Sequence, residues 1–135
     1  MACESCQGRV LVVEDDPDIR EVLRDLIGGL GCRVVLAADG VDALAQLERA
    51  GAASPCVIIA DLNMPRLGGV GLVRRVRTGR HVGTPIVTMS AEPLRERPAH
   101  VELHLDKPFD FGALAATIGR LCPGGPARGG GARRD

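Results

Sequence analysis

The sequence predicts an α/β protein in which a doubly wound, five-stranded parallel sheet lies between two layers of helices. The first observation is a set of apolar runs, unbroken at residues 10–13, 34–38 and 57–60 and nearly so at 85–89. Such runs are typical of strands buried on both faces of a parallel sheet. The second observation is that segments with helical periodicity alternate with these runs. Alternation of strands and helices predicts parallel strands joined by right-handed crossovers.

The first helix follows the strand over residues 10–13. Asp16 before Pro17 fits an N-cap followed by proline at the first helical position. Apolar residues then recur at the helical period, at Ile19, Val22, Leu23, Leu26, Ile27 and Leu30. Glycines at 28, 29 and 31 mark the end of this helix.

Two more helices are expected, one before and one after the strand that ends at Asp61. The helix over about residues 40–50 turns Leu44 and Leu47 inward and stops at Gly51. The helix over about residues 70–79 turns three valines inward, at positions 70, 73 and 76. Its arginines, at positions 74, 75 and 77, are expected to form a solvated face.

The pattern weakens after the fourth strand, which ends at Ser90. Pro93 and Pro98 leave room for about one helical turn, so a shortened or irregular fourth helix is expected. Apolar and polar residues then alternate over 101–105, which predicts a half-exposed edge strand. Asp110 is expected to cap a last helix whose apolar face comprises Phe111, Leu114, Ile118 and Leu121.

Length and composition predict one domain over residues 9–121, with a flexible amino end at 1–8 and a disordered Gly/Pro/Arg-rich tail at 122–135. The 17 basic and 17 acidic residues cancel, so no overall field favours nucleic acid or an anionic membrane. No apolar stretch approaches the length of a membrane span, and no signal-peptide pattern is present. A cytoplasmic location is the default expectation.

The cysteines and two histidines are assigned structural or surface roles. Cys32 and Cys56 adjoin core strands and are expected to be small buried hydrophobes. Cys3 and Cys6 form a C-x-x-C pair that could bind zinc or act in redox chemistry, but no second pair has ligand spacing, which favours reduced, unliganded thiols. His81 and His100 are expected on the surface.

Chemically active residues collect at the predicted carboxyl ends of the strands. They are Glu14, Asp15, Asp61, Ser90 and Lys107. In a doubly wound sheet these ends meet at one crevice, where three carboxylates repel one another and need a cation. Oxygen ligands in an open site favour Mg²⁺ (or Mn²⁺). A carboxylate can accept a phosphoryl group, for which a lysine supplies positive charge and a hydroxyl a hydrogen bond.

Four motifs at these strand ends resemble the receiver domains of bacterial two-component response regulators. They are Val12-Val13-Glu14-Asp15-Asp16-Pro17, Asp61-Leu62-Asn63-Met64-Pro65, Thr88-Met89-Ser90-Ala91 and Lys107-Pro108-Phe109. The resemblance covers about residues 9–121 and implies a five-stranded sheet in the order 2-1-3-4-5. It also implies phosphorylation by a histidine kinase or phosphotransfer protein, followed by altered binding of a downstream target.

The resemblance implies a role for each matching position. Glu14 and Asp15 are similar to the acidic pair that holds Mg²⁺, and the backbone carbonyl of Asn63 is similar to the group that completes the metal site with Asp61. Asp61 is similar to the phosphoacceptor, and Ser90 and Lys107 to the switch hydroxyl and the phosphate-binding lysine. The bond before Pro108 is commonly cis in such proteins, a state accessible to X–Pro bonds.

Two features depart from the family pattern. His104 occupies the position of the usual Tyr or Phe, which moves inward when the hydroxyl swings toward phosphate. Imidazole is smaller, polar and titratable near neutrality, so a weakened, altered or pH-sensitive switch is expected. Only sixteen residues separate Ser90 from Lys107, so the family's usual output and dimerisation face is expected to be remodelled, leaving a monomer or weak dimer.

The leading hypothesis is therefore a single-domain receiver that relays phosphate between a kinase and a target protein, without direct nucleic-acid or membrane binding. The alternative is an interaction module that retains the pocket but works without phosphorylation. A third hypothesis, an aspartate-dependent phosphohydrolase, ranks last because Asn63 stands where such enzymes usually place a second acid. No turnover of small substrates is expected.

Overall fold

A computed structural model describes residues 8–51, 53–64, 66–92, 94 and 98–122. In chain order the elements are β1 (Arg9–Val13), α1 (Pro17–Gly28), β2 (Arg33–Ala37), α2 (Gly40–Ala50), β3 (Val57–Asp61), α3 (Gly69–Arg77), β4 (Ile86–Ser90), β5 (Leu103–Asp106) and α4 (Phe111–Leu121). The strands form one parallel sheet in the order β2-β1-β3-β4-β5, which confirms the predicted topology.

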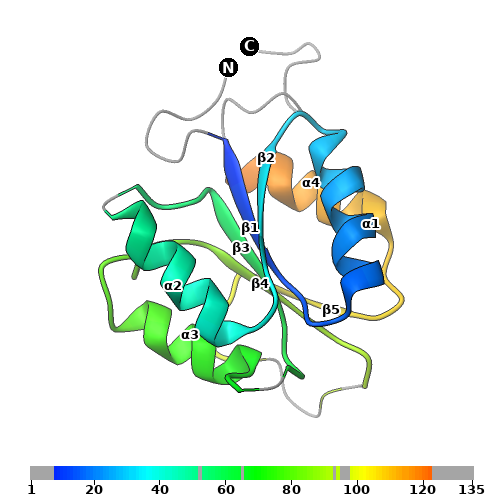
Figure 1. Ribbon diagram of the computed structural model, residues 1–135. Helices are drawn as coiled ribbons and strands as arrows, with labels where there is room; N and C mark the ends of the chain where they lie inside the picture. The colour runs from blue at the N-terminus through cyan, green and yellow to red at the C-terminus, as the bar shows by residue number, and fades with distance from the viewer. Residues whose placement is uncertain (1–7, 52, 65, 93, 95–97, 123–135) are drawn as a thin grey trace.

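Two apolar cores lie on opposite faces of this sheet. Helices α1 and α4 cover one face, and α2 and α3 cover the other (Figure 1). Alternate residues of each central strand enter alternate cores: Val12 and Ile59 pack beneath α1 and α4, whereas Val13 and Ile58 pack beneath α2 and α3. Every residue of β3 and β4 is buried, as their apolar runs predict.

The helices begin where the sequence predicts, but their buried faces are narrower than expected. Asp16 caps α1 by accepting hydrogen bonds from the amides of Asp18 and Ile19. Val22 and Leu26 lie on the predicted apolar face of α1, yet they are 54% and 40% exposed. A stripe of six apolar residues is wider than the face that one layer of the sheet can cover.

The inward face of α3 differs from the prediction in the same way. Val70 is 55% exposed, whereas Leu72 is fully buried. The helix begins at Gly69, and its buried residues follow a stripe through positions 69, 72, 73 and 76. Gly69 lies so close to the end of β3 that an added Cβ would come 2.7 Å from the Asp61 carbonyl oxygen.

Arg77 was predicted to be solvated, and this is wrong. Its guanidinium donates hydrogen bonds to the carbonyl oxygens of Val82, Thr84 and His100, at 2.7–3.1 Å. The predicted surface position of His81 is wrong too. Its ring is buried, with Nδ1 2.6 Å from the Ser54 hydroxyl and Nε2 3.2 Å from the Leu47 carbonyl oxygen. In contrast, His100 is exposed as expected.

Cys56 is buried as predicted, but it forms a disulfide with Cys122. The expectation of a simple hydrophobe is therefore corrected. Cys122, assigned to the tail from sequence, is 1% exposed and belongs to the packed domain. Cys32 is a buried free thiol, whose burial raises its pKa. The Cys3–Cys6 pair lies outside the described residues.

The connection between β4 and β5 holds no helix among its described residues, 91–92, 94 and 98–102. This agrees with the expectation that the family's helix at this point is shortened or irregular. β5 lies at the edge of the sheet, as the alternating pattern predicts. In the described part of the chain, no helix is long and apolar enough to cross a membrane.

Candidate functional site

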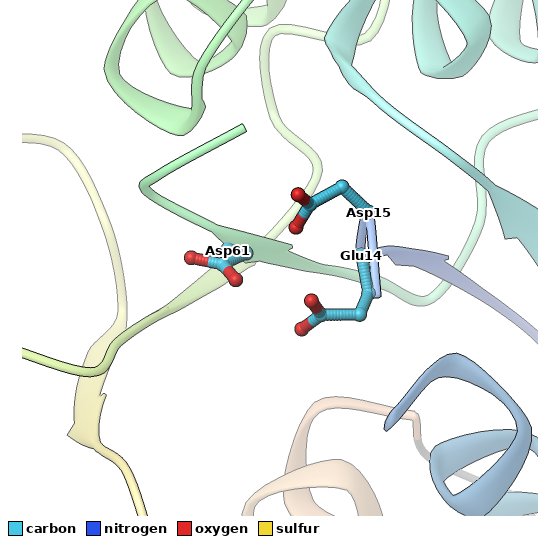
Figure 2. Close-up of side chains that lie close together, drawn as sticks. All are labelled: Glu14, Asp15 and Asp61. Atoms are coloured by element: carbon cyan, nitrogen blue, oxygen red, sulfur yellow. The ribbon is translucent and has the colours of Figure 1, made fainter. Parts of the chain in front are cut away.

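Three carboxylates meet where β1 and β3 end (Figure 2). Glu14 follows β1 and is 1% exposed, and Asp61, the last residue of β3, is 5% exposed. Asp15 is exposed beside them. One oxygen from each carboxylate lies within 4.8 Å of the others. The pairing of β1 with β3, in which Val13 faces Ala60, brings these strand ends together.

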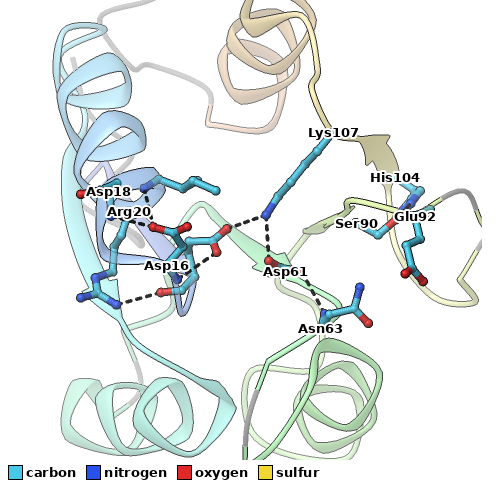
Figure 3. A network of polar contacts seen from close by, with 11 residues as sticks. Asp16, Asp18, Arg20, Asp61, Asn63, Ser90, Glu92, His104 and Lys107 are labelled. Carbon is cyan, nitrogen blue, oxygen red and sulfur yellow. Dashed lines mark hydrogen bonds and ion pairs between the residues drawn. The ribbon is translucent and has the colours of Figure 1, made fainter.

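Lys107 provides a positive charge to two of these carboxylates (Figure 3). Its Nζ lies 2.8 Å from Asp61 Oδ2 and 3.0 Å from Glu14 Oε1. Burial by itself would lower the pKa of Lys107, but hydrogen bonds to Asp61 and Glu14 outweigh burial and raise it. The ammonium is therefore firmly protonated at neutral pH. The bond between Lys107 and Pro108 is cis, as the family resemblance implies.

Glu14 is held in place by the turn that joins β1 to α1. Its Oε2 accepts a hydrogen bond from the Asp16 amide at 3.1 Å, and its carbonyl oxygen accepts one from Arg20 Nη1 at 2.9 Å. Burial raises the pKa of Glu14 against the lowering effect of hydrogen bonds from Lys107 and Asp16. The effect of burial is thus the larger one, and Lys107 offsets it only in part.

The loop after Asp61 is tied both to that residue and to α2. The Asn63 amide donates to Asp61 Oδ1 at 2.9 Å, which places Asn63 beside the cluster. Arg66 Nε donates to Asp39 Oδ2 at 2.7 Å, and the Gly40 amide donates to the Leu67 carbonyl oxygen at 3.0 Å. The hydrogen bond from Arg66 lowers the pKa of Asp39.

Sequence reasoning missed this link between Asp39 and Arg66. Asp39 also caps α2 by accepting from the Asp42 amide, and an aspartate one residue before a predicted helix could have indicated that role. Nothing local indicates the partner, because Arg66 lies 27 residues away. Arg66 has a φ of +66°, uncommon for a residue with a side chain, and its bond to Asp39 helps to hold this backbone shape.

Ser90, the last residue of β4, lies beside His104 of β5; in Figure 3 both are on the opposite side of Asp61 from Asp16. The Ser90 hydroxyl is fully buried; it donates to the Glu92 carbonyl oxygen at 2.8 Å and lies 3.1 Å from His104 Nε2. His104 Nδ1 lies 2.7 Å from the Thr88 hydroxyl. The structure thus joins both predicted switch residues and adds Thr88, which sequence reasoning did not single out.

The donor set at the acidic cluster suits a small, hard divalent cation. Carboxylate oxygens from Glu14, Asp15 and Asp61 are close enough to share one ion, and Asp15 keeps the cluster open to water. Mg²⁺ prefers such oxygen ligands and retains several waters. The absence of a described cysteine or histidine from this cluster argues against a site of the usual zinc type.

The described site can be compared with known proteins. The family model for the response regulator receiver domain matches residues 10–119. The chain belongs to this family. Sensor histidine kinase TmoS of Ectopseudomonas mendocina is 38% identical over 124 residues, and Response regulator MprA of Mycobacterium leprae is 37% identical over 119 residues. These alignments cover 87% and 84% of the chain. Receiver domains of two-component systems, including those of sensor kinases, are therefore its relatives.

The chain spans only part of its curated relatives. It covers 12% of TmoS, 50% of MprA and 23% of the Escherichia coli Regulator of RpoS, which is 41% identical over 83 residues, or 62% of the chain. A solved structure of nearly the same extent is the receiver domain of sensor histidine kinase PA1611 from Pseudomonas aeruginosa. It is 29% identical, with a TM-score of 0.76, and the match covers 84% of the chain and 96% of that structure. That structure holds a magnesium ion in its active site cleft.

Proposed function

We propose that this receiver domain accepts a phosphoryl group on Asp61, with Mg²⁺ held by Glu14, Asp15 and Asp61. The observation that carries the proposal is the convergence of three carboxylates and one lysine at a single point of the carboxyl edge. Packing alone gives no reason to bring like charges this close. The magnesium ion in the related PA1611 structure supports the choice of cation.

In this proposal each residue has a defined task. An oxygen of Asp61 attacks phosphorus, the bond from phosphorus to the donor's histidine nitrogen breaks, and that nitrogen takes up a proton. Lys107 neutralises the incoming phosphoryl oxygens, since its ammonium already lies 2.8 Å from Asp61 Oδ2. The Asn63 amide holds the other Asp61 oxygen, and the Asn63 carbonyl is proposed as a further metal ligand.

A bound Mg²⁺ would neutralise negative charge on the carboxylates and the phosphoryl group. Glu14 is preorganised for this role because Asp16 and Arg20 fix both its side chain and its backbone. Ser90 would donate its hydroxyl proton to a phosphoryl oxygen once it leaves Glu92. These groups catalyse the chain's own phosphorylation and dephosphorylation, with no turnover of small substrates proposed.

The proposed donor is a sensor histidine kinase or a phosphotransfer protein in the cytoplasm, and the proposed acceptor of the signal is a downstream target protein. The relatives TmoS and MprA, a sensor kinase and a response regulator, support this assignment. A monomer or weak dimer is proposed because the β4–β5 connection lacks a helix among its described residues.

One observation favours a second candidate, an interaction module that works without phosphorylation. The Ser90 hydroxyl is engaged with Glu92 and His104 in place of facing Asp61 (Figure 3). Such a module would keep the acidic cluster but would bind its partner equally well with and without phosphate.

The deciding experiment compares wild type with Asp61→Asn. Each protein is incubated with Mg²⁺ and beryllofluoride, a phosphoryl mimic, and backbone NMR shifts are recorded. The phosphoacceptor proposal expects shifts at the ends of β3 and β4 in wild type and none in Asp61→Asn. Intact-protein mass spectrometry after treatment with acetyl phosphate should add one phosphoryl group to wild type only. Absence of both signals in wild type would favour the second candidate.

A further inference from the structure

Four residues form a directional chain of hydrogen bonds between β4 and β5. The Ser90 hydroxyl has a single hydrogen, and it is donated to the Glu92 carbonyl oxygen, which can only accept. Ser90 must therefore act as the acceptor toward His104, so the hydrogen in the 3.1 Å contact belongs to Nε2. A neutral ring protonated at Nε2 has a lone pair at Nδ1, and that lone pair accepts from the Thr88 hydroxyl at 2.7 Å.

Burial of these side chains favours one tautomer of His104 over the other. Thr88 and Ser90 are both fully buried, and the His104 side chain is 10% exposed. A buried donor or acceptor that loses its partner costs more than an exposed one, because water cannot replace the partner. The opposite tautomer would point Nδ1–H at Thr88 and leave Nε2 without a proton for Ser90. The Ser90–Glu92 hydrogen bond thus places the proton of His104 on Nε2, and Thr88 stabilises that tautomer by donating its hydroxyl proton to Nδ1.

A second acceptor for the Nε2 proton of His104 lies nearby. Asp106 Oδ1 lies 3.5 Å from His104 Nε2, further than the Ser90 hydroxyl. Asp106 follows on the same strand, and its side chain is 69% exposed. When the Ser90 hydroxyl moves away, Nε2–H can donate its hydrogen bond to the Asp106 carboxylate instead. His104 is then not left with a buried, unpaired donor.

We propose that Thr88 and His104 form a latch that holds the Ser90 hydroxyl toward Glu92 and away from Asp61. This inference rests on the proposed phosphoacceptor function, since the latch restrains the hydroxyl that would contact the phosphoryl group. Thr88 is a positioning residue that acts through His104, and His104 acts through Ser90. When the latch releases Ser90, Asp106 replaces the Ser90 hydroxyl as the hydrogen-bond acceptor of His104 Nε2. The hold on Ser90 is therefore a hydrogen bond, in place of the bulk of a large aromatic ring.

The tautomer is tested in the unphosphorylated protein. Imidazole ¹⁵N shifts of His104 are measured at a pH of about 8, where an ordinary histidine is neutral. Wild type is expected to show a protonated Nε2 and an unprotonated Nδ1. Thr88→Val should move both shifts toward a mixture of tautomers, and Thr88→Ser, which keeps the hydroxyl, should restore the wild-type pattern. A wild-type ring protonated at Nδ1, or unchanged shifts in Thr88→Val, would overturn the latch.

The effect on Ser90 is tested by the rate of phosphorylation with acetyl phosphate and Mg²⁺. Thr88→Val and His104→Leu should each react about fivefold faster than wild type, roughly the worth of one neutral hydrogen bond. The matched control is Thr117→Val, which removes a buried hydroxyl from α4, far along the chain from the latch. Its rate should equal that of wild type.

The outcomes separate the two proposals. If wild type and all variants fail to become phosphorylated, the phosphoacceptor function is wrong, and with it the latch as a control on that function. If wild type is phosphorylated and the latch variants react at the wild-type rate, the latch is wrong and the phosphoacceptor function stands. If Thr88→Val fails to fold, His104→Leu carries the rate test, because a wild-type rate in a protein without the imidazole would also contradict the latch.

Discussion

Replacing Arg77 with methionine should destabilise the fold at the point where α3 meets two loops. The guanidinium donates to the His100 carbonyl oxygen from Nε and Nη2, at 3.1 and 2.8 Å, and to the Val82 and Thr84 carbonyl oxygens from Nη1, at 2.8 and 2.7 Å. Methionine keeps most of the aliphatic stem and removes every donor. The experiment therefore isolates the hydrogen bonds from the packing.

The expected loss is smaller than the sum of the bonds. The four hydrogen bonds to carbonyl oxygens would total about 6–12 kcal/mol at about 1.5–3 kcal/mol each. A fifth and longer contact, from Nη2 to the half-exposed Glu102 carboxylate at 3.5 Å, adds little. However, Val82 and His100 are exposed residues, so water can reach their carbonyls after the substitution. Thr84 is 4% exposed and cannot be rehydrated as easily. We expect a fall of about 2–3 kcal/mol in the free energy of unfolding, within the penalty for one unsatisfied buried acceptor.

The assay is urea unfolding followed by circular dichroism, with two comparison variants. Arg75→Met removes the same charge from an exposed position on the same helix and should change the free energy of unfolding by less than about 0.5 kcal/mol. Arg77→Lys keeps the charge, but one ammonium cannot reach three carbonyls with guanidinium geometry, so about half the loss should remain. Equal stability of Arg77→Met and Arg75→Met would refute the reasoning.

Three further predictions concern charge and covalent links. Asp39→Asn keeps a good N-cap but loses the ion pair with Arg66. Because the pKa of Asp39 is lowered in the fold, the ion pair stabilises the protein above about pH 3.8 and this stabilisation is lost as the pH falls further. The urea midpoints of wild type and variant should therefore converge in acid. Glu14→Gln should raise the free energy of unfolding at pH 7, because burial raises the pKa of Glu14 and so disfavours its charged form in the fold. The gain over wild type should vanish below about pH 4.5, and a gain that grows as the pH falls would contradict the prediction. Reducing the Cys56–Cys122 disulfide, which closes a separation of 66 residues, should lower the free energy of unfolding by about 2–4 kcal/mol, and a reduced protein with an unchanged urea midpoint would argue against it.

Much of the fold could be predicted because it is written in local patterns. An apolar run such as Val10–Val13 is compatible with a strand buried on both faces, and an aspartate before a proline marks where α1 begins. Local patterns do not show how much of an apolar stripe is covered, which is why Val22 and Val70 were expected inside and lie outside. Coverage depends on the width of the neighbouring layer, which no single helix encodes.

The candidate site likewise has one part that the sequence predicts and one part that depends on long-range pairing. Topology alone brings Glu14, Asp61 and Lys107 to one edge, so their convergence could be predicted once the strand ends were known. The partner of Thr88 depends on register. Thr88 faces His104 because β4 and β5 pair at that alignment, and a shift by one residue would turn either side chain to the other face. Sequence reasoning identified His104 but lacked the register that gives it a partner.

The Lys107 bridge has a consequence for how the chain is made. Glu14 and Asp61 precede their ammonium partner in the chain, since Lys107 comes 93 residues after Glu14 and 46 after Asp61. Glu14 and Asp61 therefore lack this partner until the segment after β5 has been synthesised and has docked against the sheet. The Lys107 bridge can therefore form only when both β1, which precedes Glu14, and β5, which precedes Lys107, have taken their places in the sheet.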